Sequence, residues 1–270
     1  DQLPGKEQDY WGACRAYCDV LYGRFMEGSG KPVCLDKTPA YGLILPFMQR
    51  VFPDAKYVAL TRHPLATFSS YANSFFDGDY QTAQNYNPIL NRYVPAMAAF
   101  LRQRDVPYIH VKYEDLVKDP DTWMEKIYAY IGVPFEKETI DYGERGSAER
   151  ADKGLGDPIG VKQHSRPTTA SVKKWVEDLA ADPAKEKLMR EVIAQLDPDD
   201  LQTCGYPADT IWKAFDEQAG KPVAQKKQKM DRYRLQRKII VKLRAQAQKG
   251  GLFRKTLKKA QLVCDVLLRE

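Results

Sequence analysis

Three side chains among the first 70 residues have the chemistry to bind an oxyanion: Lys37, Arg62 and Ser70. Lys37 follows a strand-like run at residues 32–35, and Arg62 follows another at residues 56–60. Ser70 lies eight residues beyond Arg62, about two turns into a predicted helix. Ammonium, guanidinium and hydroxyl groups all donate to oxyanions. Because open α/β sheets bind anions at the carboxyl ends of their strands, the sequence predicts an anion site there.

Hydrophobic periodicity predicts the elements that must hold these side chains in place. Helical spacing of apolar residues occurs at residues 10–26, 42–52, 64–76, 87–104, 119–132, 168–179, 183–196 and 207–219. Short apolar runs predict strands at residues 32–35, 56–60 and 106–111, and the polar stretch 136–165 is predicted to be a loop over the site. Because strands alternate with helices, we predict an α/β fold with a parallel sheet.

Composition limits the class of protein. With 270 residues, of which 43% are apolar, the chain can build one large core, so we predict one domain at residues 1–219 and a helical extension at residues 220–270. No run approaches the roughly 18 apolar residues of a membrane span, and the acidic start does not have the pattern of a signal peptide. These features favour a soluble, cytoplasmic protein.

The cysteines and histidines favour neither disulfides nor a metal site. Five cysteines form an odd number without a paired framework, which is typical of reduced thiols in a cytoplasm. Cys14 and Cys18 lie one helical turn apart, and we interpret the pair as packing. None of the three histidines lies near a cysteine pair, so no metal is predicted.

Positive charge is concentrated in the tail. Residues 221–270 contain 16 Lys and Arg against three acidic residues, a net charge of +13, so at an overall charge of +6 the remaining residues carry −7. Apolar residues recur in the tail at four-three spacing, at Phe253, Leu257, Ala260, Cys264 and Leu267. We favour docking of this piece on protein over contact with anionic lipid. Nucleic-acid binding is not predicted, because basic charge alone supports it poorly.

The segment 36–41 (Asp-Lys-Thr-Pro-Ala-Tyr), and Arg62-His63-Pro64 with Ser70, resemble the sulfotransferases that use 3′-phosphoadenosine 5′-phosphosulfate (PAPS). Heparan sulfotransferases carry a lysine segment nearly identical to residues 36–41. In the arginine segment, His63 stands where many relatives have Asp or Asn. The resemblance implies the sulfotransferase fold, a P-loop-NTPase-like parallel sheet flanked by helices, with a helical C-terminal part. It also implies that Lys37 stabilises the transition state and that Arg62 and Ser70 bind the 3′-phosphate.

Two later segments are similar to those of tyrosylprotein and bacterial sulfotransferases. Residues 111–117 imply that Tyr113 contacts the nucleotide, the alternative being a core tyrosine at a strand end. Residues 171–175 imply that Lys174 reaches the 3′-phosphate, the alternative being a plain amphipathic helix. His164 lies in a donor-rich stretch that is similar to one in the sulfotransferase domains of polyketide synthases. Its imidazole titrates near neutral pH and is a candidate to act on an acceptor hydroxyl, the alternative being a solvated loop histidine.

One part of the family's pattern does not occur in these 270 residues. The family begins with a strand and a loop that binds the 5′-phosphosulfate, and it often places a glutamate base about twenty residues later. Residues 28–31 (Gly-Ser-Gly-Lys) precede a predicted strand, so their amides would not open onto a helix N-terminus. We therefore expect that the first βα unit lies outside this sequence and contains the base, for which Glu7 is the only nearby candidate here. The chain alone would then bind PAP, the desulfated product, without transferring sulfate.

The sequence thus predicts transfer of a sulfuryl group from PAPS to a hydroxyl-bearing acceptor. Three acceptor classes stay open: a carbohydrate, favoured by the heparan-type lysine segment, a carrier-bound hydroxyacyl chain and a phenol. A catalytically inactive binding module with the same fold is the alternative function, because the 5′ loop is not seen.

Overall fold

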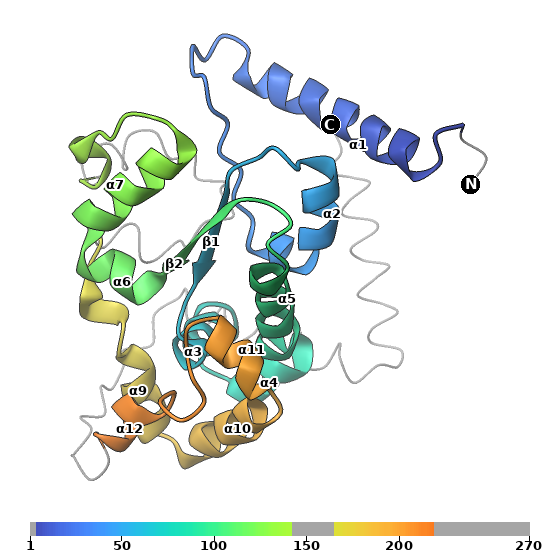
Figure 1. Cartoon of the computed structure of the whole chain (residues 1–270). Helices are drawn as coiled ribbons and strands as arrows, with labels where there is room; N and C mark the ends of the chain where they lie inside the picture. The colour runs from blue at the N-terminus through green and yellow to red at the C-terminus, as the bar shows by residue number, and fades with distance from the viewer. Residues whose placement is uncertain (1–3, 142–164, 219–270) are drawn as a thin grey trace, which may run out of the picture. The chain divides into compact units, whose positions relative to one another are not determined.

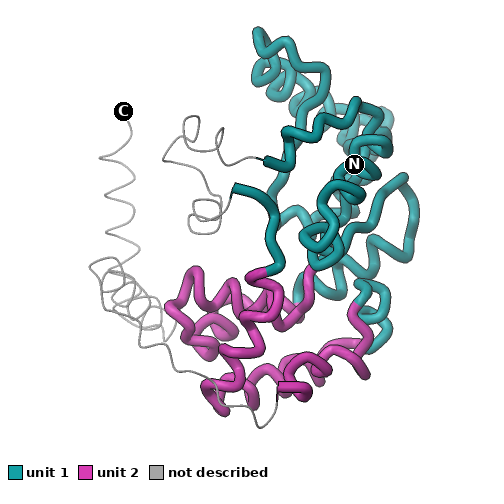
Figure 2. The backbone as a smooth tube through the Cα atoms, turned by 90° about the vertical axis from the view of Figure 1, so that its left-hand side faces the viewer, with its two compact units in different colours: residues 1–61, 92–169, 198–205 teal, residues 62–91, 170–197, 206–270 magenta. Residues whose placement is uncertain are grey.

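The computed structural model describes residues 4–141 and 165–218, which are coloured in Figure 1. The chain forms two compact units, distinguished by colour in Figure 2. Unit 1 comprises residues 1–61, 92–169 and 198–205, and unit 2 comprises residues 62–91, 170–197 and 206–270. The predicted basic extension, residues 220–270, and most of the predicted loop at residues 136–165 lie outside the described residues.

Unit 1 is built on two parallel strands. Strand β1 (Tyr57–Thr61) pairs with β2 (Tyr108–Lys112), with Tyr57 opposite Tyr108 and Thr61 opposite Lys112. Both carboxyl ends therefore lie at the same edge of the sheet. The predictions of strands at residues 56–60 and 106–111, and of parallel pairing, are confirmed.

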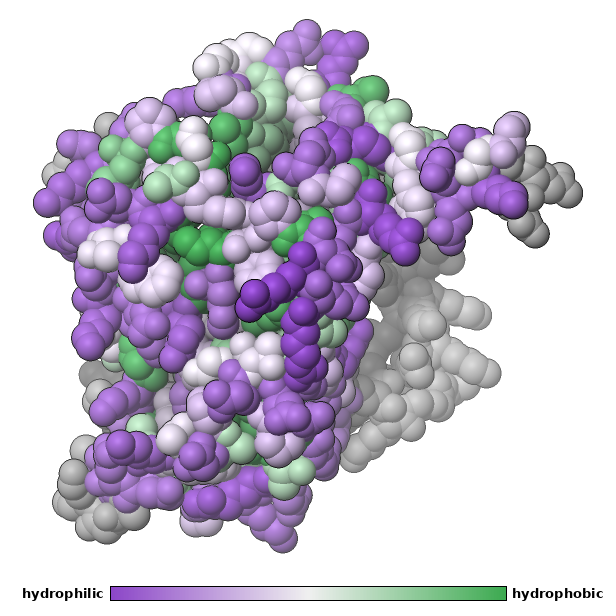
Figure 3. Space-filling model, in the orientation of Figure 1, coloured by the Kyte–Doolittle hydropathy of each residue, from purple (hydrophilic) through white to green (hydrophobic). Residues whose placement is uncertain are grey.

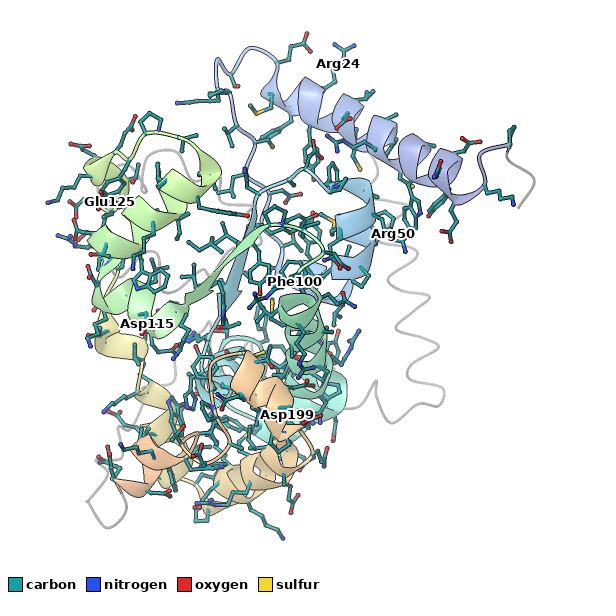
Figure 4. The ribbon with its side chains drawn as sticks, in the orientation of Figure 1. Arg24, Arg50, Phe100, Asp115, Glu125 and Asp199 are labelled. Atoms are coloured by element: carbon teal, nitrogen blue, oxygen red, sulfur yellow. The ribbon has the colours of Figure 1, made fainter. Side chains whose placement is uncertain are left out.

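A hydrophobic core fixes one face of this sheet. Helix α5 (Ile89–Gln103) carries Phe100, which is labelled in Figure 4 and packs against Tyr57 and Tyr108 at ring-centroid distances of 5.7 and 5.3 Å. The buried members of the cluster are Leu45, Ala59, Phe100, Leu101 and Val106. Helices α6 (Tyr113–Lys118) and α7 (Pro120–Ile131) contact β2, and Figure 1 shows them on the side of the strand away from α5.

Capping residues explain where helix α7 of unit 1 begins and ends. Asp119 accepts a hydrogen bond from the backbone amide of Thr122 at the start of α7, and Gly132 ends that helix with a φ of 83°, a conformation that favours glycine. The predicted helix at 119–132 is therefore confirmed. Helix α11 (Pro198–Thr203) was not predicted, and its Asp200 forms an ion pair with Arg102 of α5.

The N-terminal part of unit 1 consists of α1 (Glu7–Met26), the 3-10 turn η1 (Pro39–Leu43) and α2 (Leu45–Val51). Arg15 of α1 bonds to Asp54 at 2.7 Å and to the carbonyl of Val51 at 3.3 Å, and its guanidinium lies over the ring of Phe52. These contacts attach α1 to the turn that precedes β1. The predicted helix at 10–26 is confirmed, and η2 (Lys137–Thr139) completes the described part of this unit.

Unit 2 is helical in its described part. Its helices are α3 (Pro64–Phe76), α4 (Tyr80–Tyr86), α9 (Lys174–Ala180), α10 (Pro183–Ala194) and α12 (Lys213–Asp216), with the 3-10 turn η3 (Thr169–Ser171) before α9. Pro64 occupies the first turn of α3, where its missing N–H costs nothing, and Asp77 ends the helix in the left-handed conformation. α3 packs against α4 and α9, and α10 packs against both α4 and α9.

Three predictions of secondary structure need correction. Residues 32–35 form no strand, because no neighbouring backbone pairs with them in the described structure, and Leu35 is 87% exposed. The helix predicted at 168–179 begins only at Lys174, after η3. The helix predicted at 207–219 is reduced to α12. α4 and α6 were not predicted, because both are shorter than two full turns and show little periodicity.

Two adjacent phenylalanines of α3 allow a test of this packing. Phe76 is 1% exposed and Phe75 is 55% exposed. We expect Phe76→Ala to lower the free energy of unfolding by about 3–5 kcal/mol, because it removes a buried ring and leaves a cavity. Phe75→Ala, the matched control, should cost less than about 1 kcal/mol. Urea denaturation measures both, and equal losses would contradict the placement of α3.

Candidate functional site

The lysine segment of unit 1 is held by a carboxylate. Asp36 accepts one hydrogen bond from the hydroxyl of Tyr22 at 2.6 Å and another from the hydroxyl of Tyr41 at 2.7 Å. Tyr22 comes from α1 and Tyr41 from η1, so the two donors fix the residue just before Lys37 from two directions. Lys37 itself is exposed. The backbone at Lys37 is thus anchored while its ammonium group reaches solvent.

Electrostatics keep both tyrosines in the donor form. The hydrogen bond to Asp36, followed by burial, raises the pKa of Tyr22 far above its ordinary value of 10.0, and the same causes raise the pKa of Tyr41. Both hydroxyls therefore stay protonated at neutral pH and continue to donate to the carboxylate. Tyr22 was not predicted as a site residue, since nothing in its sequence position links it to Asp36, fourteen residues later.

Polar side chains line one face of the sheet at its carboxyl edge. Thr61 of β1 is hydrogen-bonded to Nε2 of His110 of β2 at 2.8 Å, and Lys112 stands on the same face. Burial first, and the nearby Lys112 second, lower the pKa of His110 below 6.5. The imidazole is therefore neutral at physiological pH. Tyr113 begins α6 immediately after Lys112 and is half-buried.

The arginine segment belongs to unit 2. Arg62 is half-buried, and its carbonyl accepts a hydrogen bond from the hydroxyl of Thr67 at 3.5 Å. The next residue, His63, stacks on Trp175 of α9, with ring centroids 4.8 Å apart and an interplanar angle of 16°. Ser70 lies on α3 and is half-buried. Arg62 and Ser70 therefore flank the first two turns of one helix.

Helix α9 carries the remaining predicted cation. Lys174 is its first residue and is exposed, whereas the following Trp175 is only 3% exposed. Asp178, one turn further along, accepts hydrogen bonds from Ser69 and Asn73 of α3, both at 2.5 Å. These contacts make α9 a direct neighbour of the helix that carries Ser70. Asp178 was not predicted, although its spacing of four residues from Lys174 was visible in the sequence.

The predicted site residues divide between the two units. Arg62, Ser70 and Lys174 lie in unit 2, on or next to helices that pack together, whereas Lys37 and Tyr113 lie in unit 1. His164 lies outside the described residues. Residues 28–31 follow α1 and lead into extended chain, with φ of 74° at Gly28 and 64° at Gly30, so their amides open onto no helix.

Surface hollows do not mark the candidate site. Two open hollows of about 560 and 570 Å³ lie over α1 and its flanks. One is lined by Asp19, Val20, Gly23, Arg24, Met26 and Glu27, and the other by Pro4, Gly5, Lys6, Glu7, Gln8, Trp11 and Arg50. Neither contains Lys37, Arg62 or Lys174. Both hollows are open to solvent, and acidic side chains line each of them beside the basic ones.

Two searches of the described residues bear on the class of protein. Within residues 4–141 and 165–218, no three His, Cys, Asp or Glu side chains are grouped so that they could hold a metal ion. In the same residues, every helix is too short or too polar to cross a membrane.

The lowered pKa of His110 predicts how stability depends on pH. Because folding disfavours the protonated imidazole, the unfolded state binds the proton more readily, and the free energy of unfolding is highest above pH 6.5. It should fall as the pH drops below that value toward the folded-state pKa. His110→Gln, which keeps a side chain able to hydrogen-bond Thr61, should flatten the curve between about pH 7.5 and about pH 5. Parallel curves for the two proteins, measured by urea denaturation, would refute this origin.

Comparison with known proteins gives two matches. A family model described as "Sulfotransferase family" matches residues 2–137, half of the 270-residue chain. A stretch of 61 residues is 30% identical to the nodulation protein NoeE of Sinorhizobium fredii (strain NBRC 101917 / NGR234). That stretch is 23% of this chain and 15% of NoeE, so the similarity spans only a small part of that relative.

Proposed function

Because the chain belongs to the sulfotransferase family, we propose that it takes part in transfer of a sulfuryl group from PAPS to a hydroxyl group, releasing PAP. The observation that carries the donor assignment is the packing of α3 on α9 in unit 2. This packing makes the helices of Ser70 and Lys174 neighbours, and Arg62 directly precedes α3. Two cations and a hydroxyl suit a phosphate that carries up to two negative charges.

In the proposed reaction the acceptor oxygen attacks the sulfur atom of PAPS. A new S–O bond forms, the bond between sulfur and the 5′-phosphate oxygen breaks, and the acceptor hydroxyl loses its proton. Negative charge builds on the leaving phosphate, where the ammonium of Lys37 would stabilise it. The hydrogen bonds of Tyr22 and Tyr41 to Asp36 support this role, because they anchor the backbone beside Lys37.

We propose two candidates for the group that accepts the proton of the acceptor hydroxyl. His164 is one candidate, at a position outside the described residues. Glu7 is the other, and its carboxylate lies 3.9 Å from Arg50 on the exposed surface of α1 and α2. Tyr113, at the end of β2, is proposed to contact the nucleotide.

We propose a carbohydrate as the first acceptor class, with a carrier-bound hydroxyacyl chain and a phenol as the others. A catalytically inactive binding module is the second candidate function. It is favoured by one observation, that the amides of residues 28–31 open onto no helix and so offer no cradle for the 5′-phosphosulfate. Protein or membrane contact through residues 220–270 is a further proposal. We propose no metal and no nucleic acid for this chemistry.

The donor assignment predicts the effect of removing Arg62. Arg62→Ala should weaken PAP binding by about 2–4 kcal/mol, because a charge-assisted hydrogen-bonding fork is lost. This corresponds to roughly thirtyfold to a thousandfold in Kd, measurable by calorimetry. Arg24→Ala is the matched control, since Arg24 is an exposed arginine of α1 (Figure 4). Equal Kd values for wild type and Arg62→Ala would overturn the assignment.

The role of Lys37 predicts a separation of binding from turnover. Lys37→Ala should lower sulfate transfer far more than it weakens PAP binding, because the ammonium acts mainly in the transition state. Transfer from labelled PAPS to oligosaccharides and to p-nitrophenol would be measured with the full-length protein. Lys31→Ala, another exposed lysine nearby, is the control. Near-normal transfer by Lys37→Ala would make Lys37 a surface charge without a catalytic role.

A further inference from the structure

A cluster of three polar side chains joins α3 to α9. Ser69, which is only 4% exposed, and Asn73 both donate to Oδ2 of Asp178 at 2.5 Å, and Asn73 also donates to the hydroxyl of Ser69 at 3.3 Å. Ser69 and Asn73 are four residues apart and so share one face of α3. The carboxylate of Asp178 therefore bridges two successive turns of that helix. We call these three residues the α3–α9 clamp.

The clamp lies next to the candidate phosphate ligands. Ser69 is the neighbour of Ser70, and Asp178 lies one turn after Lys174 on the same face of α9. The hydroxyl of Ser69 donates its hydrogen to Asp178. We therefore assign only the adjacent Ser70 to the phosphate. The clamp thus acts on both helices within one turn of a proposed ligand.

A ring stack makes a second attachment between the same segments. His63 lies parallel to Trp175 at 4.8 Å, and the edge of Tyr206 meets His63 at a centroid distance of 5.5 Å. His63 directly follows Arg62, and Trp175 directly follows Lys174. A single contact would leave α9 free to rotate about it, whereas the stack and the clamp together fix the orientation of α9 against α3.

We propose that Asp178 is a positioning residue that gives the nucleotide site its preference for a 3′-phosphate, a proposal that rests on the function proposed above. Through the clamp, Asp178 would hold the start of α9 where the ammonium of Lys174 meets the same phosphate as Arg62 and Ser70. Simple electrostatics argues for the opposite effect. A carboxylate near a phosphate repels it, so removal of Asp178 would tighten binding if the residue acted only through its charge.

The proposal is testable, because loss of a positioning residue would weaken PAP binding whereas loss of a repulsive charge would tighten it. PAP affinity would be measured by calorimetry, and AMP affinity by displacement of PAP, since AMP differs from PAP by the missing 3′-phosphate. Asp178→Ala should lower the affinity for PAP by about tenfold, because Lys174 would no longer be held against the 3′-phosphate and one charge-assisted hydrogen bond contributes an effect of this order. Its affinity for AMP, which lacks that phosphate, should change less than about twofold. Ser69→Ala should also lower the affinity for PAP, but by less than Asp178→Ala does, and should leave the affinity for AMP nearly unchanged.

Control variants separate the possible causes. Glu177→Gln removes the same charge from an exposed neighbouring residue of α9 and should leave the ratio of PAP to AMP affinity unchanged. Asp178→Asn keeps one acceptor oxygen, should fall between wild type and Asp178→Ala, and carries the test if Asp178→Ala does not fold. A variant that merely loosened the fold would lower both affinities together.

The outcomes distinguish this proposal from the proposed function. In one outcome, Asp178→Ala and Ser69→Ala leave the ratio of PAP affinity to AMP affinity unchanged, whereas Arg62→Ala lowers it. The positioning role of Asp178 then fails, and the donor assignment stands. Tighter PAP binding by Asp178→Ala would show that charge alone matters, and would also overturn the positioning role. If Arg62→Ala leaves the ratio unchanged, or wild type binds no PAP, the proposed function itself fails.

Discussion

Parallel pairing of β1 with β2 is the constraint on which the placement of the candidate residues depends. It sets Thr61 opposite Lys112, so Arg62 and Tyr113 are the next residues after two adjacent strand ends. Parallel strands cannot be joined by a tight turn, and the chain must cross over through α3, α4 and α5. The crossover begins with the helix that carries Ser70. The positions of the candidate anion ligands thus depend on the order in which strands and helices are connected, as well as on the local sequence.

Two carboxylates play similar parts beside two proposed catalytic or binding lysines. Asp36 precedes Lys37 and accepts from two tyrosines, and Asp178 follows Lys174 by one turn and accepts from α3. In both cases the carboxylate is engaged by uncharged donors from another element. In the described part of the chain neither lysine forms a salt bridge, so both ammonium groups remain available to an anionic ligand.

The sequence predicted well wherever a local signal has a direct structural meaning. Pro64 at the start of α3 and Gly132 at the end of α7 marked real boundaries, because each residue has a backbone preference that few others share. The strand predicted at residues 32–35 failed, because pairing depends on a neighbour that sequence pattern does not reveal. Within the site, the residue types of Lys37 and Arg62 suggested anion chemistry at once. The contacts that hold the surrounding elements were not predicted, since partners such as Tyr22 and Asp36, or Ser69 and Asp178, have no local pattern that links them.

The exposed face of β1 has a consequence for solubility. β1 is an uncharged, β-prone segment, and β2 is its only partner strand in the described structure. Val58 and Leu60, on the face away from Ala59, are 39% and 50% exposed, and Figure 3 shows apolar residues at the surface in the region of the strands. Such segments self-associate unless flanking charges oppose it. Lys56 and Arg62 flank β1, so positive charges near both of its ends oppose self-association of the segment.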